Sequence, residues 1–270
     1  MPLFIAVAIF FIVRPALAQT VDIPIPDIVG AESVSGYTQI YYESKGNRNF
    51  ITQGNINSRM PFWVGEYIVY VSDIDGLGQV FFYNLASETR IQLTFIGNNL
   101  NPKVDDKGRV TWEGWQQPDT TWQIYYFDGK SVRKLTSGDL SLNPDLSGEY
   151  ISYGRRGVNG TWRAVIYSIK DDKSIDVTLG ENSRNPKIRN GDIYLGVDSM
   201  NEEKFPLSVS DLFLLNLTPL TATSSGNPIL DELSATVSGV VEVPLSSESG
   251  SPTPQSAPSG QSEASPTPGT

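Results

Sequence analysis

Short stretches in which apolar and polar residues alternate recur along most of the chain, and turn-forming residues separate them. Residues 122–127 form one such stretch, and the dipeptide Asp128-Gly129 that follows is typical of a tight hairpin. Residues 132–136 then form a second short stretch. An alternation with a period of two places successive side chains on opposite faces of a β-strand. The pattern therefore predicts antiparallel β-strands joined by turns.

Two landmarks recur along the chain with an almost constant spacing. The first is a proline, preceded by Met in its first copy and by Asn in the others: Pro61, Pro102, Pro144, Pro186 and Pro228. The second is a threonine that follows an aliphatic residue: Thr52, Thr94, Thr136, Thr178 and Thr221. Successive copies lie 41 to 43 residues apart. Because two landmarks keep the same period over five copies, the sequence predicts a repeat architecture.

Each period holds four predicted strands, which we call a, b, c and d in chain order. In the unit 101–136 they are residues 101–104, 109–112, 122–127 and 132–136. A recurring unit of four short antiparallel strands is typical of a β-propeller blade. Because each blade packs against another blade on either side, both of its faces are expected to be apolar. The predicted fold class is all-β, a β-propeller of four-stranded antiparallel blades.

Three neighbouring stretches resemble the repeat of TolB-type β-propellers. They are Ile-Val-Tyr-Val-Ser-Asp-Ile-Asp-Gly at 68–76, Gln-Val-Phe-Phe-Tyr-Asn-Leu at 79–85 and Thr-Arg-Ile-Gln-Leu-Thr at 89–94, and residues 101–108 resemble the opening of the next blade. The same repeat occurs in propeller domains of prolyl-oligopeptidase-like enzymes. The resemblance covers about residues 37–221 and implies the fold, but it implies little about function. The N-terminal domain of TolB and a peptidase domain have no counterpart in this sequence.

The repeat also predicts how many blades there are and how the ring closes. The complete units are residues 60–94, 101–136, 143–178 and 185–221. Residues 37–52 supply only strands c and d of a further blade, and residues 227–243 could supply its strands a and b. We therefore expect five blades with two-plus-two closure by the N- and C-terminal segments. An open arc of four blades, or a different N-terminal partner strand, is the alternative.

The two ends of the chain differ in composition from the repeats. Residues 3–13 are apolar and are followed by an Ala-x-Ala sequence that ends at Ala18, as in a secretory signal, with an uncleaved N-terminal anchor as the alternative. An exported chain without cysteine indicates a periplasmic or secreted bacterial protein. The predicted division is 1–18 signal peptide, 19–36 lead segment, 37–245 propeller domain and 246–270 disordered tail rich in Pro, Ser and Thr.

The composition excludes several kinds of chemistry. The chain has no His and no Cys, so it holds no Ser-His-Asp triad, no thiol nucleophile and no zinc site built on these ligands. Its 30 acidic residues against 20 basic ones give a net charge of −10, which disfavours nucleic acid and anionic lipid as partners. We expect no cofactor, no metal site and no membrane insertion after signal cleavage. The expected state is a monomer whose partner is a protein or a glycan of the cell envelope.

Candidate binding residues come from the predicted connections between strands. The a–b and c–d turns are short and lie on one rim, whereas the b–c and d–a loops share the other rim and vary more, the longest being 197–209. Variable loops on a rigid scaffold commonly carry function. The candidates on this rim are Trp115, Glu113, Asp73, Asp75, Arg155, Arg156 and Asn159.

Trp115 is the strongest of these candidates. Trp112 and Trp122 fall on predicted strands and are expected in the core, whereas Trp115 falls in a loop, where it can stack on a sugar or on a partner side chain. The Asp73-x-Asp75 pair lacks the further ligands and the final glutamate of a calcium loop. A turn between strands is therefore the better interpretation of this pair.

The sequence leaves three functions open. The first is an exported, non-catalytic binding module that recognises a protein or a glycan through the b–c and d–a loop rim. The alternative is a five-bladed propeller glycoside hydrolase, which would use carboxylates near the channel. Asp145 occupies such an inner position, in alternation with Lys103 and Lys187 of the neighbouring units. The third is a structural role in which the tail tethers the propeller to the envelope.

Overall fold

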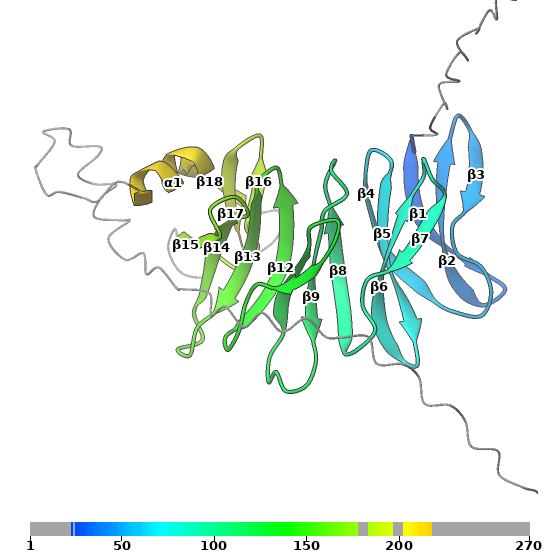
Figure 1. Ribbon diagram of the computed structural model, residues 1–270, viewed down its shortest axis with the longest axis horizontal. Helices are drawn as coiled ribbons and strands as arrows, with labels where there is room; N and C mark the ends of the chain where they lie inside the picture. Colours follow the sequence, from blue (N-terminus) through cyan, green and yellow to red (C-terminus); the bar gives the residue numbers. More distant parts are fainter. Residues whose placement is uncertain (1–22, 24, 178–182, 197–201, 218–270) are drawn as a thin grey trace, which may run out of the picture.

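The computed structural model describes residues 23, 25–177, 183–196 and 202–217. Five antiparallel β-sheets lie side by side in chain order (Figure 1). The first sheet contains β1 (Ile28–Val34), β2 (Tyr37–Ser44) and β3 (Asn47–Phe50). The second contains β4 (Ser58–Val64), β5 (Tyr67–Ile74), β6 (Leu77–Asn84) and β7 (Thr89–Gln92). The third contains β8 (Asn98–Val104), β9 (Val110–Trp115), β10 (Gln123–Phe127) and β11 (Val132–Lys134).

The remaining sheets continue the row. The fourth contains β12 (Leu140–Ser147), β13 (Tyr150–Arg156), β14 (Trp162–Ser168) and β15 (Lys173–Val177). The fifth contains β16 (Lys187–Arg189), β17 (Asp192–Gly196) and β18 (Glu202–Ser208), and the helix α1 (Val209–Leu217) follows it. In every sheet each strand pairs with the next one along the chain. The expectation of four-stranded antiparallel units is confirmed for the second, third and fourth sheets.

The hydrophobic core lies between the sheets, in layers. In the third sheet, Trp112 and Tyr125 pack toward the second sheet, with ring centroids 5.8 Å apart. Ile124 and Tyr126, from the other face of the same sheet, pack toward Ile151 and its neighbours in the fourth. A strand turns alternate side chains to opposite faces, so a sheet between two others must be apolar on both. Each inner sheet is therefore stabilised from two sides, as the sequence predicted.

The repeated proline marks a β-bulge in the first strand of each inner sheet. The ladder between β8 and β9 shifts register between Leu100 and Lys103, and corresponding shifts occur in β4 and β12. The residue before the proline has a positive φ in all three: Met60 (53°), Asn101 (52°) and Asn143 (56°). Asn tolerates this conformation better than most residues, and proline fits at a bulge because it has no N–H to donate. The landmark thus bends the strand at a fixed place in each unit.

The repeated threonine locks the end of the last strand onto the third. Its Oγ1 accepts a hydrogen bond from a backbone N–H of strand c: Thr52 from Ile40 (2.8 Å), Thr94 from Val80 (2.9 Å) and Thr136 from Ile124 (2.8 Å). In two of the three copies the threonine hydroxyl also donates a hydrogen bond to the side chain of a glutamine on strand c, at 2.7 Å in each. These bonds satisfy buried polar groups where the chain leaves the sheet.

The first sheet differs from the prediction for the ends of the chain. The segment 19–36 was expected only to lead into the propeller, but it contains β1, which pairs with β2 along its whole length. β1 therefore occupies the strand-b position that we had assigned to residues 227–243, which lie outside the described residues. The first and fifth sheets stand at opposite ends of the row (Figure 1), so the described residues form an open row.

The prediction for the fifth unit was wrong in its second half. Strand c of the unit 185–221 was expected after the loop 197–209, at Leu212, but Leu212 lies in α1, and strand c is instead β18, inside that loop. The helix starts with reciprocal bonds: Ser208 Oγ accepts the Asp211 N–H, and Asp211 Oδ2 accepts the Ser208 N–H, both at 3.2 Å. This is the logic of a capping box. Val209, Leu212 and Phe213 then bury one face of the helix against the fourth and fifth sheets.

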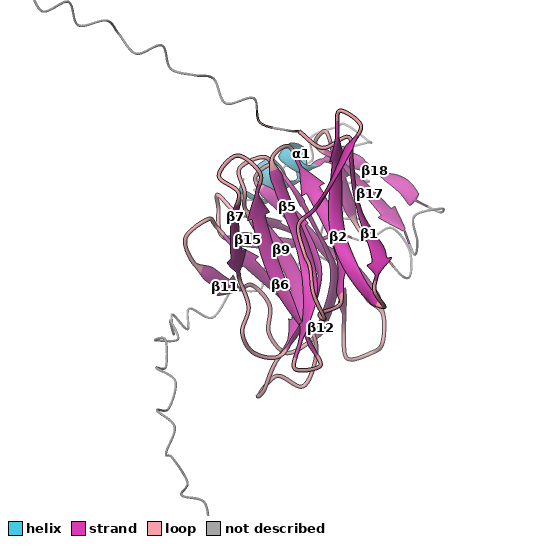
Figure 2. Ribbon diagram, turned by 90° about the vertical axis from the view of Figure 1, so that its right-hand side faces the viewer, coloured by secondary structure: helices cyan, strands magenta, loops and turns pink. Residues whose placement is uncertain are grey.

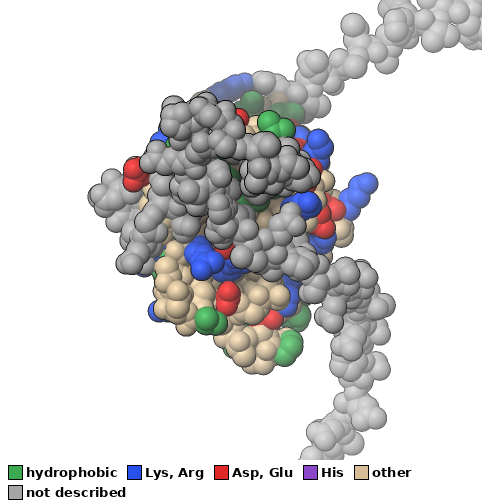
Figure 3. Space-filling view, turned by 90° about the vertical axis from the view of Figure 1, so that its left-hand side faces the viewer, with side chains coloured by type: hydrophobic (Ala, Val, Ile, Leu, Met, Phe, Trp, Pro, Cys, Tyr) green, Lys and Arg blue, Asp and Glu red, His purple; other side chains and the backbone are tan. Residues whose placement is uncertain are grey.

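The outer face of the fifth sheet is polar, unlike the faces between sheets. Lys204 pairs with Asp192 (2.6 Å), and Arg189 pairs with Glu202 (2.6 Å), while Phe205 lies on the buried face. Basic and acidic side chains are visible at this end of the molecule (Figure 3). Viewed from the opposite end, the strands of all the sheets run between an upper and a lower rim (Figure 2).

Candidate functional site

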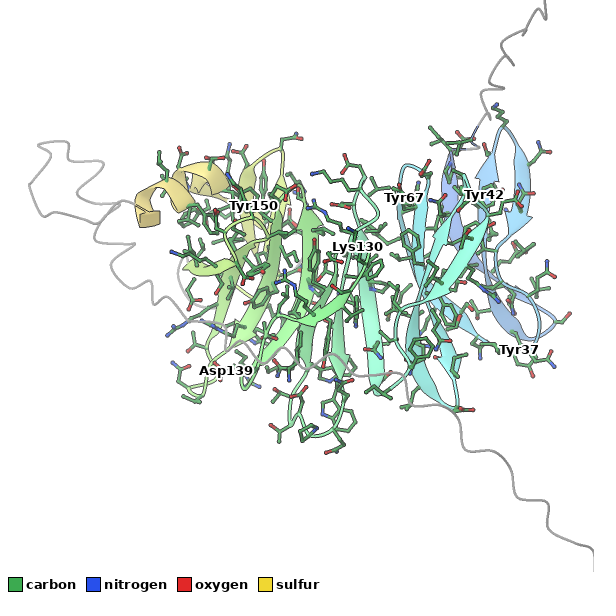
Figure 4. All side chains as sticks on the ribbon, viewed as in Figure 1. Tyr37, Tyr42, Tyr67, Lys130, Asp139 and Tyr150 are labelled. Atoms are coloured by element: carbon green, nitrogen blue, oxygen red, sulfur yellow. The ribbon has the colours of Figure 1, made fainter. Side chains whose placement is uncertain are left out.

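The strands place their connections on two rims with different roles. The hairpin rim carries the a–b and c–d turns, and the loop rim carries the b–c and d–a connections, as the sequence predicted. Tyr67 and Tyr150 follow turns of the hairpin rim, whereas Tyr37 and Asp139 mark the loop rim on the lower side of Figure 4. The two rims present different chemistry to the solvent.

The hairpin rim is densely charged. Its turns contain Lys45, Glu66, Glu88, Asp105, Asp106, Lys107, Arg109, Asp128, Lys130, Glu149, Lys170, Asp171 and Asp172. From β1 to β15, the connections of the loop rim contain only Asp75, Asp119 and Asp139 as charged residues. Such an asymmetry does not follow from folding alone, because both rims consist of exposed connections on the same scaffold. It distinguishes the loop rim as the less charged surface.

The loop rim also exposes large apolar side chains. Phe95 is 73% exposed and Ile96 is 63% exposed, in the connection between β7 and β8. Leu77, at the start of β6, is 41% exposed, and Trp115, at the end of β9, is 36% exposed. We call these four residues the apolar patch. Ile56 and Val158 are further exposed apolar residues in connections of the same rim.

Backbone contacts hold the members of the patch together. The Gly78 N–H, next to Leu77, donates to Asn98 Oδ1 (2.9 Å), and Asn98 lies opposite Trp115 in the ladder between β8 and β9. Gly97 has φ 69°, and a Cβ there would lie 2.3 Å from the Trp115 carbonyl oxygen. Only glycine allows this close approach. The loop that carries Phe95 and Ile96 is therefore pressed against the end of β9.

A buried hydrogen-bond network fixes this loop from below. Asn99 Nδ2 donates to the Ile96 carbonyl (3.0 Å), and Asn99 Oδ1 accepts from Trp112 Nε1 (3.1 Å). Gln79 Nε2 donates to the Gly97 carbonyl (2.9 Å). Because these polar groups are satisfied inside the protein, the loop is rigid and the side chains of Phe95 and Ile96 project into solvent.

Glu113 lies away from this patch, on the face of the third sheet that packs toward the fourth. Its Oε2 accepts the Asn143 backbone N–H at 2.8 Å. Burial raises the pKa of Glu113 above its usual range. The carboxylate is thus committed to a neighbouring strand and does not project from the rim.

The inner strands carry a row of side chains, each directly after the motif proline. Lys103 Nζ lies 4.5 Å from the ring centroid of Phe62, and Lys187 Nζ lies 4.0 Å from Asp145 Oδ1. Burial raises the pKa of Asp145, with both lysines opposing the shift. Burial lowers the pKa of Lys103, and the charge of Lys187 adds to that effect. The predicted alternation of charge along the inner strands is present, and its charges neutralise one another.

Most of the other predicted site residues are engaged within their own sheets. Asp73 forms an ion pair with Arg59. Arg155 Nη2 contacts both carboxylate oxygens of Asp176, at 2.5 and 2.6 Å. Asp75, with φ 51°, forms the two-residue turn between β5 and β6 together with Gly76.

The last two candidates stabilise the loop between β13 and β14. Arg156 Nε donates to the Gly160 carbonyl (3.2 Å), and Asn159 Oδ1 accepts the Thr161 N–H (3.1 Å). The predicted residues therefore do not form one site. Trp115 alone belongs to the apolar patch. Leu77, Phe95 and Ile96 were missed, although the Phe95-Ile96 pair directly after Thr94, outside any predicted strand, was a usable signal.

Metal ligands and membrane-spanning helices were also sought in the described part of the chain. In that part, no three acidic side chains come close enough together to hold a metal ion. None of its helices has both the length and the apolar character needed to cross a bilayer.

Comparisons with known proteins give similarities of fold only. No protein-family model matches the chain, and no curated protein matches it. Among solved structures, TolB from Acinetobacter baumannii is 16% identical with a TM-score of 0.47, and the match covers 67% of this chain and 52% of that one. A prolyl endopeptidase structure is 13% identical with a TM-score of 0.48, covering 67% and 34%.

A nidogen/laminin complex is a further structural neighbour, 15% identical with a TM-score of 0.43, covering 58% of this chain and 63% of that one. This chain spans about half the length of the Acinetobacter TolB. At these TM-scores none of the likenesses carries an argument about what the chain does. The description of its fold is based on the strand pairing in its own sheets.

Proposed function

We propose that the protein is an exported, non-catalytic binding module that holds a protein or glycan partner on its loop rim. The observation that carries the proposal is the contrast between the two rims. The hairpin rim is crowded with charge, whereas the connections of the loop rim from β1 to β15 contain only three charged residues and expose apolar side chains such as Phe95 and Ile56. Binding surfaces are typically depleted of charge at their centre and enriched in aromatic residues. Export to the periplasm or beyond belongs to the same proposal.

A capture experiment with matched variants tests this function. The chain from residue 19 onward is immobilised and exposed to an envelope extract, alongside a loop-rim variant (Phe95→Ser with Ile56→Ser) and a hairpin-rim variant (Glu88→Ser with Lys130→Ser). We expect one set of bound molecules that the loop-rim variant loses and the hairpin-rim variant keeps. Equal retention by both variants, or loss only in the hairpin-rim variant, would contradict the proposal.

A closed five-bladed ring is part of the proposal for the scaffold. Strand b of the first sheet is β1, so only the inner strand-a position of that sheet is without a strand among the described residues. The Asn227-Pro228 dipeptide continues the period of the motif that marks strand a in the second, third and fourth sheets. We therefore propose that residues 227–230 supply this strand. The closing blade then combines three strands from the N-terminal part of the chain, β1 to β3, with one strand from the C-terminal part.

A glycoside hydrolase remains the second candidate, because two carboxylates occupy inner positions. Burial raises the pKa of both Glu113 and Asp145, and both carboxylates oppose the lowered pKa of Lys103, which lies near them. Such enzymes use one carboxylic acid with a raised pKa as the general acid and a second carboxylate that stays ionised. The test is a panel of chromogenic glycosides. Turnover that Glu113→Gln or Asp145→Asn abolishes would favour the hydrolase, and no turnover above a blank favours the binding module.

A further inference from the structure

Building on the proposed function, we propose that the apolar patch of Leu77, Phe95, Ile96 and Trp115 binds an uncharged, apolar segment of a protein partner. The loop rim as a whole spans several sheets, but these four side chains come from only the second and third sheets and the connection between them. The inference narrows the partner to one class and the site to one place on the rim.

The exposure of the patch is not a by-product of core packing. Phe95 and Ile96 are adjacent in the chain and both project into water, at 73% and 63% exposure. The polar groups beneath them are satisfied, since Asn99 holds the Ile96 carbonyl and Gln79 holds the Gly97 carbonyl. The loop could therefore present polar side chains without loss to the fold. A rigid loop that instead presents two large apolar side chains resembles the anchor of a protein interface, where little ordering entropy is lost on binding.

The charge around the patch identifies the kind of partner. Asp73 is neutralised by Arg59, and Asp119 contacts Lys134 Nζ at 2.9 Å, so these two carboxylates are already paired, whereas Asp75, in the turn before Leu77, is exposed. The residue after Trp115 is Gln116, whose Cβ lies 2.7 Å from the position of a Cβ on Gly97. The surface thus has an apolar centre, with an amide and the exposed carboxylate of Asp75 at its edge. Its complement is an apolar segment without acidic residues.

The same features argue against a glycan and against a membrane. A sugar needs several side chains that bond its hydroxyl groups, but Asn98 is already used by the Gly78 N–H and Asn99 by Trp112 and the Ile96 carbonyl, which leaves Gln116 as the amide at the edge of the patch. Leu77 and Ile96 also lack the flat face on which a sugar ring stacks. A bilayer with anionic lipid is disfavoured because the chain carries a net charge of −10 and the patch has no basic residue of its own.

The experiment uses a phage-displayed library of random peptides selected on the chain from residue 19 onward. Synthetic versions of the selected peptides are then titrated by calorimetry against the parent protein, Phe95→Ser/Ile96→Ser and Val158→Ser. Val158 is the matched control, because it is a fully exposed apolar residue on the same rim, in the loop of the fourth sheet. Thermal melting checks that both variants fold as the parent does.

We expect selected peptides that are rich in Leu, Ile, Phe or Trp and poor in charge. The Phe95→Ser/Ile96→Ser variant should weaken their binding by about tenfold or more, and Val158→Ser should leave it within about twofold. Peptide binding that only Val158→Ser weakens would overturn the inference about the apolar patch, while leaving the proposed binding function of the loop rim intact. An absence of selected peptides, a consensus of charged residues, or Phe95-dependent binding to phosphatidylcholine vesicles or a glycan array would also overturn the inference.

Discussion

Replacing Thr94 with valine removes a hydroxyl that ties the last strand of the second sheet to the third. Thr94 is buried, its Oγ1 accepts the Val80 backbone N–H at 2.9 Å, and its hydroxyl donates to Gln79 Oε1 at 2.7 Å. Valine has nearly the same shape, so the change deletes the hydrogen bonds without opening a large cavity. It leaves one buried N–H unpaired and weakens the bonding of one buried amide oxygen.

The structure sets the size of the expected loss. An unsatisfied buried donor or acceptor costs roughly 1–3 kcal/mol. Gln79 Oε1 keeps a long contact to Asn99 Nδ2 at 3.4 Å, so its loss is partial. We expect Thr94→Val to lower the free energy of unfolding by about 2–3 kcal/mol. Thr94→Ser keeps the hydroxyl and loses only a methyl group, which corresponds to about 1 kcal/mol or less.

A second copy of the motif supplies an internal comparison. Thr52 accepts the Ile40 N–H at 2.8 Å, but the corresponding Gln39 Oε1 is buried without a partner among the described residues. Thr52→Val therefore removes one bond where Thr94→Val removes two, and should cost about 1 kcal/mol less. Thr89, which is exposed on β7, is the control, and its change to valine should stay within about 0.5 kcal/mol of the parent.

Urea denaturation followed by tryptophan fluorescence measures all four variants. The m-value should stay constant, so that the shifts in midpoint report stability. A free energy of unfolding for Thr94→Val within about 0.5 kcal/mol of the parent would refute the reasoning that the repeated threonine locks each sheet.

Three further predictions concern the rim, the end of the chain and acid stability. Trp115→Ala should weaken partner binding while leaving the melting temperature nearly unchanged, and a large loss of melting temperature would place Trp115 in the core. Deleting residues 227–243 should lower the melting temperature of the whole domain if they supply the closing strand, and unchanged melting contradicts that closure. Hydrogen bonds from Lys107 and Arg109 lower the pKa of Glu149, so its contribution to stability is present above its usual value of 4.5 and is lost as the pH falls through the lowered value. Glu149→Gln should therefore lose less stability than the parent between neutral and acidic pH, measured by thermal melting, and an unchanged pH dependence would show that the pair contributes nothing.

The repeat was predictable from sequence because its landmarks have fixed structural tasks. The proline marks the bulge of strand a, and the threonine marks the end of strand d. Each copy of the two landmarks therefore corresponds to one sheet. The glutamine partner was missed, although Gln39, Gln79 and Gln123 each precede the aliphatic residue of strand c. The signal was present at the same period, and only the hydrogen bonds in the structure gave it a meaning.

Strand register was predicted less well than strand existence. The spacing of the repeat aligns Val165 with Ile40, Val80 and Ile124 on strand c, but those three pack toward the next sheet, whereas Val165 packs back toward the third. Ile166 is the residue that packs toward the next sheet. A shift of one residue exchanges the two faces of a strand, and a strand buried on both faces gives no polar side to reveal the error.

The helix α1 was missed because a short apolar run does not distinguish a strand from a helix. Residues 212–215 read Leu-Phe-Leu-Leu, and such a run is compatible with strand c by composition. The better signal was Ser208 followed by Asp211 three residues later, which starts a helix by capping.

Site residues could be predicted only in part. The sequence identified the loop rim and Trp115, because variable connections are visible in an alignment of the repeats with one another. The sequence did not show that Asp73 is paired with Arg59 or that Arg155 is paired with Asp176, since these partners come together only when the strands pair. Most of the predicted candidates were therefore charged residues, and the apolar pair Phe95 and Ile96 was missed.

Hydrogen–deuterium exchange on the chain from residue 19 onward, with and without a bound peptide from the selection, tests the central claim most directly. The account predicts slower exchange at residues 93–99 and 113–117 on the loop rim, and unchanged exchange in the hairpin-rim turns at 104–110 and 127–132. Protection confined to those hairpin-rim turns would contradict it.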